Sequence, residues 1–361
     1  MNRVESAEAI GEVDELLARV GLEHGRRRTL AGTWEGGERR ARKPEMTENT
    51  TRIPVAGRAA MQSRTAVQAA GWAKYGWLRH GFSTRMGGVS PIYGEGSLNL
   101  GWTKEDEPAN VAENRRRFVR EVAGGKAAEA WPLVTLRQFH TGLIRTVEAG
   151  DRRLATADGR AVLRGDGMMT DAPGVLLGVQ VADCVPVLVA DVRRRAVAAF
   201  HAGWRGTLKR IVERGIGTMR LRYGSRPEDL VAAVGPAIGA CCYSVGEEVR
   251  HDFESQFAYA EELFSERYDS DPVREKYPLL FLTARAPGHS NIGPQIHLDL
   301  WEANRRQLLD AGLKASRITV LGECTACTRV KGGGLKYFSH RGESGFAGRM
   351  MGMVGVAKEK D

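Results

Sequence analysis

The sequence contains no hydrophobic run long enough to cross a membrane. Its longest apolar stretch, residues 174–190, is interrupted by Gln180, Asp183 and Pro186, whereas a helix that spans a bilayer needs about 20 consecutive apolar residues. The N-terminus, MNRVESAEAIGEVDELL, has early acidic residues and lacks the apolar region of a secretory signal. We therefore expect a cytoplasmic protein that does not contact a membrane.

Cysteines are few and odd in number. The five are Cys184, Cys241, Cys242, Cys324 and Cys327. An odd number in a chain without a secretory signal argues against a disulfide framework. Cys324 and Cys327 form a C-x-x-C, but the chain has no second C-x-x-C to complete a four-cysteine zinc site. The motif is thus only a weak indication of redox or zinc chemistry.

The positive charge has no accompanying nucleic-acid motif. The formal net charge is +9, but the arginine triplets at 26–28, 115–117 and 193–195 are scattered and separated by acidic residues. No zinc-finger, RNA-recognition or helix-turn-helix signature is present, so we expect no nucleic-acid partner. A basic surface also suits small anionic substrates such as phosphate. No coiled-coil heptads appear, and we expect a monomer.

Residues 1–65 differ in composition from the rest of the chain. They are polar and rich in glycine, arginine, threonine and glutamate, and only residues 7–20 could form a short amphipathic helix. We expect a disordered or poorly ordered extension there, followed by one domain over residues 66–361. Met46 and Met61 both precede that domain. The extension could therefore be a functional arm or the result of a misassigned start codon.

From about residue 71 the pattern is that of a globular α+β protein. Helices are expected over 106–123, 205–223 and 299–313, the last beginning at an Asp299 cap and ending at Gly312. Strands are expected near 77–90, 131–140, 174–191, 195–203, 229–239 and 317–325. Because helices and strands mix without a regular βαβ period, we favour α+β with a mixed sheet over a doubly wound parallel sheet.

Residues 181–206, VADCVPVLVADVRRRAVAAFHAGWRG, read as a hairpin with one thiol and one imidazole. If the turn is residues 191–194, Ala190 faces Arg195 and Cys184 lies directly opposite His201. Opposed residues share a face of the sheet, with Cβ atoms about 4.5–5.5 Å apart, which suits two ligands of one metal ion. A turn that is one residue longer or shorter weakens this pairing, and Pro186 is able to end the strand.

His140 is available as a third ligand at the end of the strand VTLRQFH. Two histidines and a cysteine, with one position left for water or substrate, match a catalytic zinc site. Taken singly, a cysteine in an apolar strand usually only packs. Together with the acid at Asp183 and the small residues Gly203 and Gly206, the three favour a site.

A series of long motifs resembles one known family. They include HGFSTRMGGVS, SLNLG, QFHTG, DGMMTDAPGVLLGVQVADCVPVLVAD, AAFHAGWRGTLKRIV, VGPAIGACCYSVGEEV and CTACTRVKGGGLKYFSHRGESGFAGRM, in this order. Together they resemble the family known as multicopper polyphenol oxidase (laccase-type), peptidoglycan editing factor or purine nucleoside phosphorylase. The resemblance spans roughly His80 to Val356, and A-D-C-x-P and H-A-G-W-R-G are its most specific motifs.

The resemblance implies a single-domain α+β fold with a mixed β-sandwich core flanked by helices. It also implies a metal site, usually zinc and in some members copper, with His140, Cys184 and His201 at the positions of the family's ligands. The implied activity is phosphorolysis of purine nucleosides, namely adenosine, inosine, guanosine and methylthioadenosine, with adenosine deamination as a side activity. Ser244, where the family commonly has glutamate, and His340, at a variable position, leave the substrate detail open.

Phosphorolysis requires an anion site, and arginine is well suited to it. Arg85 lies in the glycine turn STRMGGVS, where backbone N–H groups would also contact phosphate. We assign catalysis to Cys184, His201 and Arg85. We expect substrate contacts from Arg85, Gly87, Asn99, Asp183, Trp204, Arg205 and Arg341, with Arg341 and Arg349 as weaker candidates than Arg85 and Arg205.

Three alternatives remain open at this point. Cys184 is either a metal ligand or a free nucleophile activated by His201, and the latter would suit a hydrolase that edits peptidoglycan precursors. A basic nucleotide-binding module would bind without turnover. Two histidines and a cysteine also resemble a blue-copper centre. However, the chain has eight histidines and no His-x-His pair, so it lacks the additional copper ligands of a complete laccase.

Overall fold

The computed structural model of the chain describes residues 65–124, 131–150, 159–267 and 295–358. Contacts along the chain separate Met1–Thr51 from Arg52–Asp361, and all the described residues belong to the second unit. The extension expected over residues 1–65 lies outside the described residues, apart from Thr65. Among the described residues, no helix is both long and apolar enough to span a bilayer.

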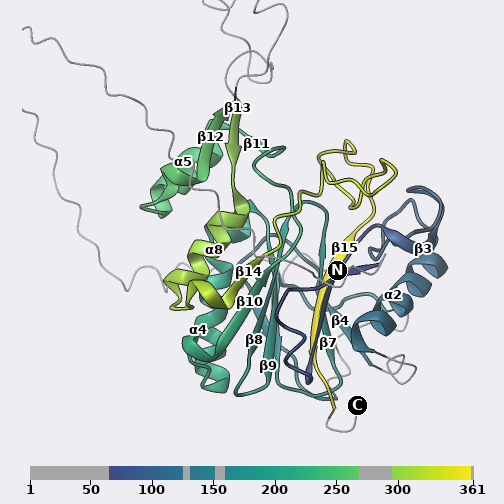
Figure 1. Ribbon diagram of the computed structural model, residues 1–361, viewed down its shortest axis with the longest axis horizontal. Helices are drawn as coiled ribbons and strands as arrows, with labels where there is room; N and C mark the ends of the chain where they lie inside the picture. The colour runs from purple at the N-terminus through teal and green to yellow at the C-terminus, as the bar shows by residue number, and fades with distance from the viewer. Residues whose placement is uncertain (1–64, 125–130, 151–158, 268–294, 359–361) are drawn as a thin grey trace, which may run out of the picture. The chain divides into compact units, whose positions relative to one another are not determined.

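Two main β-sheets form the centre of the second unit (Figure 1). The first has the strand order β1–β2–β15–β7–β4, with bounds β1 Ala66–Val67, β2 Leu78–Ser83, β15 Met350–Val356, β7 Leu176–Val181 and β4 Leu133–Thr135. The second has the order β14–β10–β8–β9–β6–β5, with bounds β14 Ile318–Val320, β10 Leu230–Val234, β8 Val185–Asp191, β9 Ala196–Ala202, β6 Gly167–Thr170 and β5 Ile144–Thr146.

A smaller third sheet has the order β11–β13–β12. Its bounds are β11 Ser244–Val245, β13 Gln295–Leu298 and β12 Phe264–Arg267, and a further strand, β3, spans Met86–Ser90. Most neighbouring strands are antiparallel, but β4 with β7, β5 with β6, and β10 with β14 are parallel. The sheets are therefore mixed, as the sequence predicts.

The two main sheets pack face to face, which follows from the alternation of side chains along their strands. In β8, Val187 and Val189 belong to one buried cluster, whereas Leu188 and Ala190 belong to another. The second cluster also contains Leu177 of β7 and residues of β15, which are in the first sheet. Because successive side chains of a strand point to opposite faces, β8 has one face on the other sheet and one on the helices.

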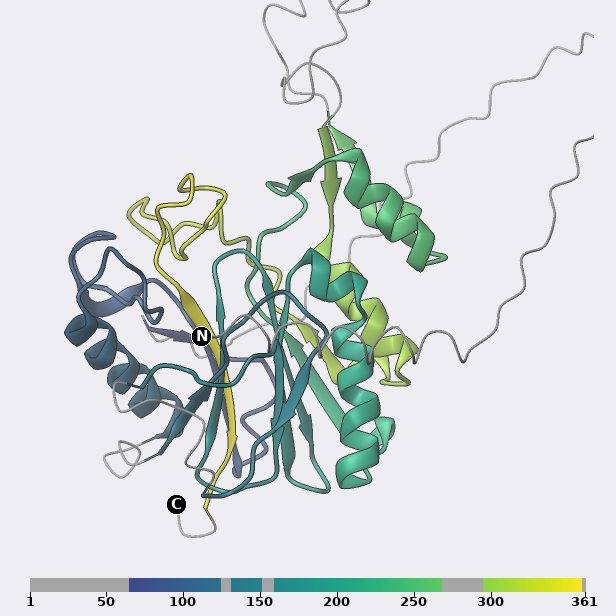
Figure 2. The same ribbon diagram turned by 180° about the vertical axis from the view of Figure 1, so that it is seen from behind.

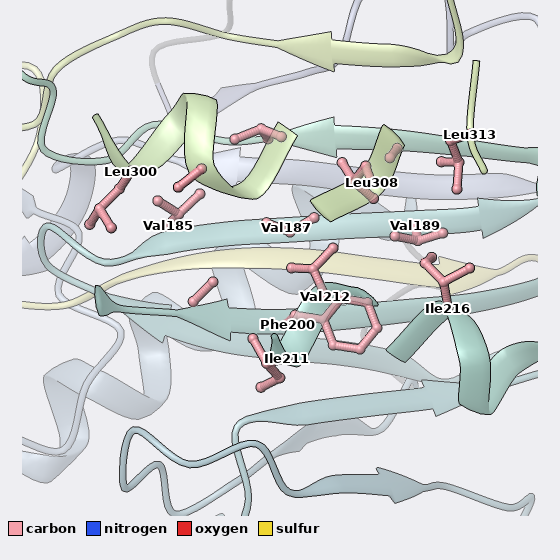
Figure 3. Packing of buried hydrophobic residues seen from close by; sticks show 14 of the residues in the cluster. Val185, Val187, Val189, Phe200, Ile211, Val212, Ile216, Leu300, Leu308 and Leu313 are labelled. Atoms are coloured by element: carbon pink, nitrogen blue, oxygen red, sulfur yellow. The ribbon is translucent and has the colours of Figure 1, made fainter. Parts of the chain in front are cut away.

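Helices cover the outer face of each sheet (Figures 1 and 2). Their bounds are α2 Pro108–Ala123 on the first sheet, and α4 Ile211–Tyr223 and α8 Leu300–Asp310 on the second; the short α3 Trp204–Leu208 precedes α4, and α5 Glu247–Gln256 lies beside the third sheet. Phe118 of α2 packs with Leu176 and Met353 of the first sheet. Figure 3 shows Val185, Val187 and Val189 of β8 and Phe200 of β9 beside the apolar residues of α4 and α8. The expected β-sandwich flanked by helices is thus confirmed.

The expected helices over 106–123 and 299–313 are present as α2 and α8. The Asp299 side chain accepts a hydrogen bond from the Glu302 N–H, so it caps α8 as expected. The helix expected over 205–223 is instead divided into α3 and α4. Arg210 lies between them with φ of 55°, in the left-handed region, which a continuous right-handed helix does not include. The prediction of one helix was wrong at this residue.

The β8–β9 hairpin is present, but its register differs from the expectation. Asp191 faces Ala196 and Pro186 faces His201, so the prediction that Cys184 lies directly opposite His201 was wrong. The turn occupies residues 192–195 rather than 191–194. Moving the turn by one residue changes the partner of every position by two, and a change of two preserves the face of the sheet. Cys184 and His201 therefore remain on the same side of the hairpin, in a diagonal arrangement.

Candidate metal and substrate site

His140, Cys184 and His201 converge at one end of the two sheets. His140 lies in the connection from β4 to β5, Cys184 in the connection from β7 to β8, and His201 near the end of β9. One ligand atom from each lies within 4.8 Å of the other two. The Cys184 Sγ is 3.8 Å from the His140 Nε2, and the imidazole centroids are 4.9 Å apart. The structure thus brings together the three side chains that the sequence predicts as ligands.

Both connections that provide these ligands cross from the first sheet to the second. At these connections the backbone adopts positive φ at two non-glycine residues, with φ of 59° at His140 and 89° at Asp183. Few non-glycine residues adopt positive φ, and such residues often mark functional sites. Gly203 adds to the crowding, because a Cβ there would lie 2.7 Å from the Cys184 Sγ and 3.0 Å from the His140 Cδ2. Only glycine leaves room for these side chains.

Asp166 holds the two histidines in place, and sequence reasoning did not identify it. Its carboxylate accepts a hydrogen bond from the His201 Nδ1 at 2.9 Å and from the His140 backbone N–H at 2.9 Å. It also accepts from the backbone N–H and the hydroxyl of Thr141, each at 2.7 Å. With Nδ1 occupied in this way, His201 has only Nε2 left for a ligand. Asp166 lies in the family motif DGMMT, but its position before a strand gave no separate signal.

The electrostatics of the half-buried Cys184 and the buried His201 favour a thiolate beside a charged imidazole. Burial alone would raise the pKa of the Cys184 thiol, but the charge of His201 and the hydrogen bond to His140 lower that pKa to about 6. Burial would likewise lower the pKa of His201, but the neighbouring Cys184 and the hydrogen bond to Asp166 raise it to about 9. Despite complete burial, hydrogen bonds from His201 and Thr141 hold the pKa of Asp166 far below its ordinary value.

The three side chains line a cavity of about 910 Å³. Two aromatic residues, Trp102 and Tyr243, also line it. Burial raises the pKa of the Tyr243 hydroxyl well above its ordinary value, and the nearby Cys184 adds to this effect. The remaining lining includes His340 and the arginines Arg137, Arg160, Arg341 and Arg349. The cavity therefore combines thiol and imidazole groups able to bind a metal ion with aromatic rings and positively charged arginines.

Asp183 and Arg341, both predicted to contact substrate, line this cavity. The Asp183 carboxylate accepts from the Thr325 hydroxyl at 2.7 Å and from the Arg341 backbone N–H at 2.7 Å. Arg341 donates from Nη1 to the backbone O and to the Oγ of Ser244, each at 2.9 Å. Asp183, which directly precedes Cys184, thus joins two later loops to the backbone beside the predicted ligand.

Arg85 and Gly87 line a different cavity, of about 1360 Å³, which does not include the three ligands. The Arg85 guanidinium donates to Glu343 at 2.9 Å and to the backbone O of Tyr93 at 2.7 Å, and it lies 4.6 Å from the Phe338 ring centroid. The structure therefore does not bring Arg85 to Cys184 and His201.

The other three predicted contacts, Asn99, Trp204 and Arg205, do not line the first cavity. Asn99 is fully buried and donates to Asp106 at 2.7 Å, while its Oδ1 accepts from the Arg349 N–H at 2.9 Å. Trp204 begins α3 and packs against the helix-covered core. The Arg205 guanidinium stacks 4.2 Å from the Trp204 ring centroid. Asn99 consequently positions Arg349, which does line the cavity.

The three predicted ligands fit one divalent metal ion. Two imidazoles and a thiolate, with a position left open, are a donor set typical of catalytic zinc. Zinc bonds of about 2.3 Å to sulfur and 2.0 Å to nitrogen in a tetrahedron place these atoms about 3.6 Å apart. The Sγ to Nε2 distance of 3.8 Å is near that value. The carboxylate of Asp166 behind His201 matches the outer-shell partner that orients metal-binding histidines.

The chain matches a known protein family in sequence and a solved structure in fold. The family model described as "Multi-copper polyphenol oxidoreductase laccase" matches residues 79–357. The chain belongs to this family. A fold of the same kind is present in the crystal structure of the Bacillus licheniformis protein YfiH, with a TM-score of 0.66, 30% sequence identity, and coverage of 81% of this chain and 97% of that one.

The similar proteins of this laccase-like family are named as enzymes. Purine nucleoside phosphorylase YlmD of Geobacillus stearothermophilus is 34% identical over 294 residues, which are 79% of this chain and 96% of that protein. Adenosine deaminase RL5, from an unknown prokaryotic organism, is 29% identical over 247 residues, which are 68% of this chain and 84% of that protein. The family and the Cys/His cluster both indicate a metal-binding enzyme.

Proposed function

We propose that this protein is a zinc-dependent purine nucleoside phosphorylase. Its substrates would be phosphate and adenosine, inosine, guanosine or methylthioadenosine, and it would also deaminate adenosine. The observation that best supports this function is the position of His140, Cys184 and His201 in a cavity with aromatic and arginine side chains. The names of similar proteins agree with both activities.

Phosphate would bind to the arginines of the cavity. Arg341 and Arg349 both line it, and arginine forms two parallel hydrogen bonds to phosphate oxygens. Arg85 lies in the other cavity, so we propose Arg341 and Arg349 for the phosphate role that the sequence assigned to Arg85. Several positive charges in one cleft also raise the local concentration of an anionic substrate.

The purine base would bind against Trp102 and Tyr243. Aromatic rings offer flat surfaces on which a base stacks, and a buried tyrosine hydroxyl usually finds a hydrogen-bond partner. With its pKa raised by burial, the Tyr243 hydroxyl stays protonated at neutral pH and would be able to donate a hydrogen bond to a bound base. Such a donor at a purine nitrogen would stabilise the departing base as the bond to the ribose breaks.

His140, Cys184 and His201 would hold the zinc ion. When bound, the ion would supply Lewis-acid chemistry that polarises the substrate for phosphorolysis and activates water for deamination. Asp166 accepts a hydrogen bond from the His201 Nδ1, so the Nε2 would bind the ion after it loses the proton that it carries in the charged imidazole. The low pKa of Cys184 provides the thiolate form that metal binding requires.

Alanine variants of the three ligands test this function. We expect His140→Ala, Cys184→Ala and His201→Ala each to lower phosphate-dependent release of adenine from adenosine by about 100- to 1000-fold, a loss typical of removing one electrostatic stabiliser of the transition state. His251→Ala is the matched control, because His251 is exposed on α5. Full activity of the Cys184→Ala and His201→Ala proteins would exclude the proposal.

A second candidate is a hydrolase that edits peptidoglycan precursors with Cys184 as nucleophile. It is favoured by the series Cys184, His201 and Asp166, in which the Asp166 carboxylate accepts from the His201 Nδ1 at 2.9 Å, since cysteine hydrolases use such an arrangement. A thiolate bound to zinc is a weaker nucleophile, so the two functions compete for one sulfur. Mass spectrometry of peptidoglycan precursors from a deletion strain separates the two functions. Only the editing function predicts that precursors with a misincorporated amino acid accumulate in that strain.

A further inference from the structure

A second group of sulfur atoms lies apart from the three predicted ligands. Cys241 and Cys242 follow β10, and Cys324 and Cys327 follow β14, and their four Sγ atoms all lie within 4.8 Å of one another. The Sγ atoms of Cys241 and Cys327 are 3.6 Å apart. All four cysteines are free. The sequence offered only one C-x-x-C, and the fold completes the set with an adjacent pair that lies over 80 residues earlier.

The parallel pairing of β10 with β14 explains why these cysteines meet. Ala232, Ala233 and Val234 pair in register with residues 318–320, and the carboxyl ends of parallel strands lie at the same edge of a sheet. The two following loops remain in contact through a bridge between Ala237 and Cys324. The parallel pairing of β10 with β14 therefore brings together the cysteines of two segments that are distant in sequence.

The spacing of the four thiols suits a single tetrahedral ion. With metal–sulfur bonds of about 2.3 Å, the sulfur atoms of a tetrahedron lie about 3.8 Å apart, close to the 3.6 Å between Cys241 and Cys327. An iron–sulfur cluster distributes its cysteines over several iron atoms and so needs a wider opening. Soft thiolate donors select zinc and similar ions over magnesium or calcium.

The surroundings of the four thiols resemble those of a metal-bound thiolate. The Gly239 N–H donates to the Cys324 Sγ at 3.3 Å, and outer-shell hydrogen bonds of this kind stabilise the charge on sulfur. A Cβ on Gly239 would lie 2.8 Å from the Trp301 ring and 3.2 Å from the Cys241 Sγ. Glycine at this position thus permits the loop to approach both the helix and the cysteines.

We propose that Cys241, Cys242, Cys324 and Cys327 bind a structural zinc ion. A site of four thiolates leaves no position open for substrate, which distinguishes it from the site at Cys184. The ion would join the loop after β10 to the loop after β14. It is a separate site, and its existence does not depend on the nucleoside phosphorylase function proposed above.

The position of this ion links it to one wall of the substrate cavity. Tyr243, which lines the cavity, directly follows Cys242. Thr325 lies between Cys324 and Cys327 and donates from its hydroxyl to Asp183 at 2.7 Å, and Asp183 directly precedes Cys184. An ion that fixes the two loops would therefore also fix the aromatic wall and the backbone beside the first site.

The test uses the full chain with Cys184→Ala, which removes a ligand of the first site and leaves the four clustered cysteines. The protein is reduced, reconstituted with zinc under inert gas and freed of loosely bound metal, and zinc per chain is measured by elemental analysis. We expect one zinc per chain in the Cys184→Ala protein and none when Cys324→Ser and Cys327→Ser are added. Retention of zinc by the triple variant, or its absence from Cys184→Ala, would overturn the proposal.

Cobalt spectroscopy provides an answer that does not require the triple variant to fold. Reconstitution of Cys184→Ala with Co²⁺ should give intense visible bands of tetrahedral cobalt together with thiolate charge-transfer bands in the near ultraviolet. A spectrum of octahedral cobalt without thiolate bands would contradict the assignment. The zinc count and the cobalt spectrum both measure metal binding and not catalysis. A failure of either one is therefore distinguishable from a failure of the proposed nucleoside phosphorylase function.

Discussion

Gly203 is a residue at which the first site has little room for a larger side chain. The predicted Cβ of an alanine would stand 2.7 Å from the Cys184 Sγ, a separation that requires a side chain or the backbone to move. Both neighbours are short side chains that contact each other, with the Cys184 Sγ 3.8 Å from the His140 Nε2, so neither moves without disturbing the other. A methyl group at this position should therefore displace ligands while leaving the core intact.

We expect Gly203→Ala to reduce phosphate-dependent base release by about 100-fold, because a misplacement of about 1 Å at reacting groups costs that much. Gly217→Ala is the matched control. Gly217 is exposed on α4, and nothing lies within 4 Å of its added Cβ, so alanine should stabilise the helix by about 0.5–1 kcal/mol. Initial rates and circular dichroism of both variants test this, and equal activity of the two would contradict the crowding argument.

Asp166 is the residue on which the orientation of both histidines depends. Asp166→Asn preserves the shape but places an NH₂ group where the carboxylate accepts from Thr141 or His201. We expect a 10- to 100-fold loss of zinc affinity, the usual effect of removing an outer-shell partner. Competition with a chelator measures this affinity, and an unchanged value in a folded variant would show that Asp166 does not support the metal site.

At the residue scale, the sequence pointed to the three side chains that the structure brings together, but it did not point to the residues around them. His140, Cys184 and His201 are chemically distinctive and belong to specific motifs. Asp166, Trp102 and Tyr243 are ordinary residue types whose roles come from where the fold places them. Arg85 illustrates the reverse case, because a glycine turn suggests anion binding, yet Glu343 is 2.9 Å from its guanidinium. The chemistry of a side chain does not determine which cavity it faces.

At the scale of elements, strand β2 contains a buried histidine that makes stability depend on pH. His80 is 4% exposed, its Nε2 accepts from the Ala69 N–H at 3.0 Å, and its ring lies 4.7 Å from Trp72. Burial lowers the pKa of His80 to about 4. The folded protein therefore holds His80 neutral at a pH where the unfolded chain protonates it.

The sign of the effect follows from this difference. Above pH 6.5 His80 is neutral in both states, but between pH 6.5 and pH 4 only the unfolded chain gains the proton, so the free energy of unfolding falls by roughly 3 kcal/mol as the pH decreases. His80→Gln keeps an acceptor for Ala69 without a titrating group and should lose less stability over this range. Urea unfolding at pH 7 and pH 4.5 tests this, and identical losses for both proteins would contradict it.

The elements themselves were predictable where a local signal determines them. α8 has its Asp299 cap, and β8 and β9 are continuous apolar runs. The break at Arg210 and the hairpin register were not predictable, because they depend on tertiary contacts that override local preference. The register error was harmless for the site, since the two ligands stayed on one face. A turn that changed in length by one residue would have placed them on opposite faces.

At the scale of the second unit, the two-sheet architecture explains why both sulfur-containing sites lie where they do. The first site lies where the chain crosses from one sheet to the other, after β4 and after β7. The second lies where two parallel strands, β10 and β14, end side by side. The family motifs predicted the sandwich, but they did not predict that the adjacent cysteines would meet the C-x-x-C. That contact depends on strand order, which spacing along a chain does not reveal.

Product analysis of the unmodified protein tests the central claim most directly. The protein is loaded with zinc and incubated with adenosine, inosine, guanosine or methylthioadenosine, each with and without phosphate, and the free base and the pentose 1-phosphate are quantified by mass spectrometry. We expect equal amounts of the two products, formed only when phosphate is present. The absence of phosphate-dependent base release from adenosine, inosine, guanosine and methylthioadenosine would contradict the account.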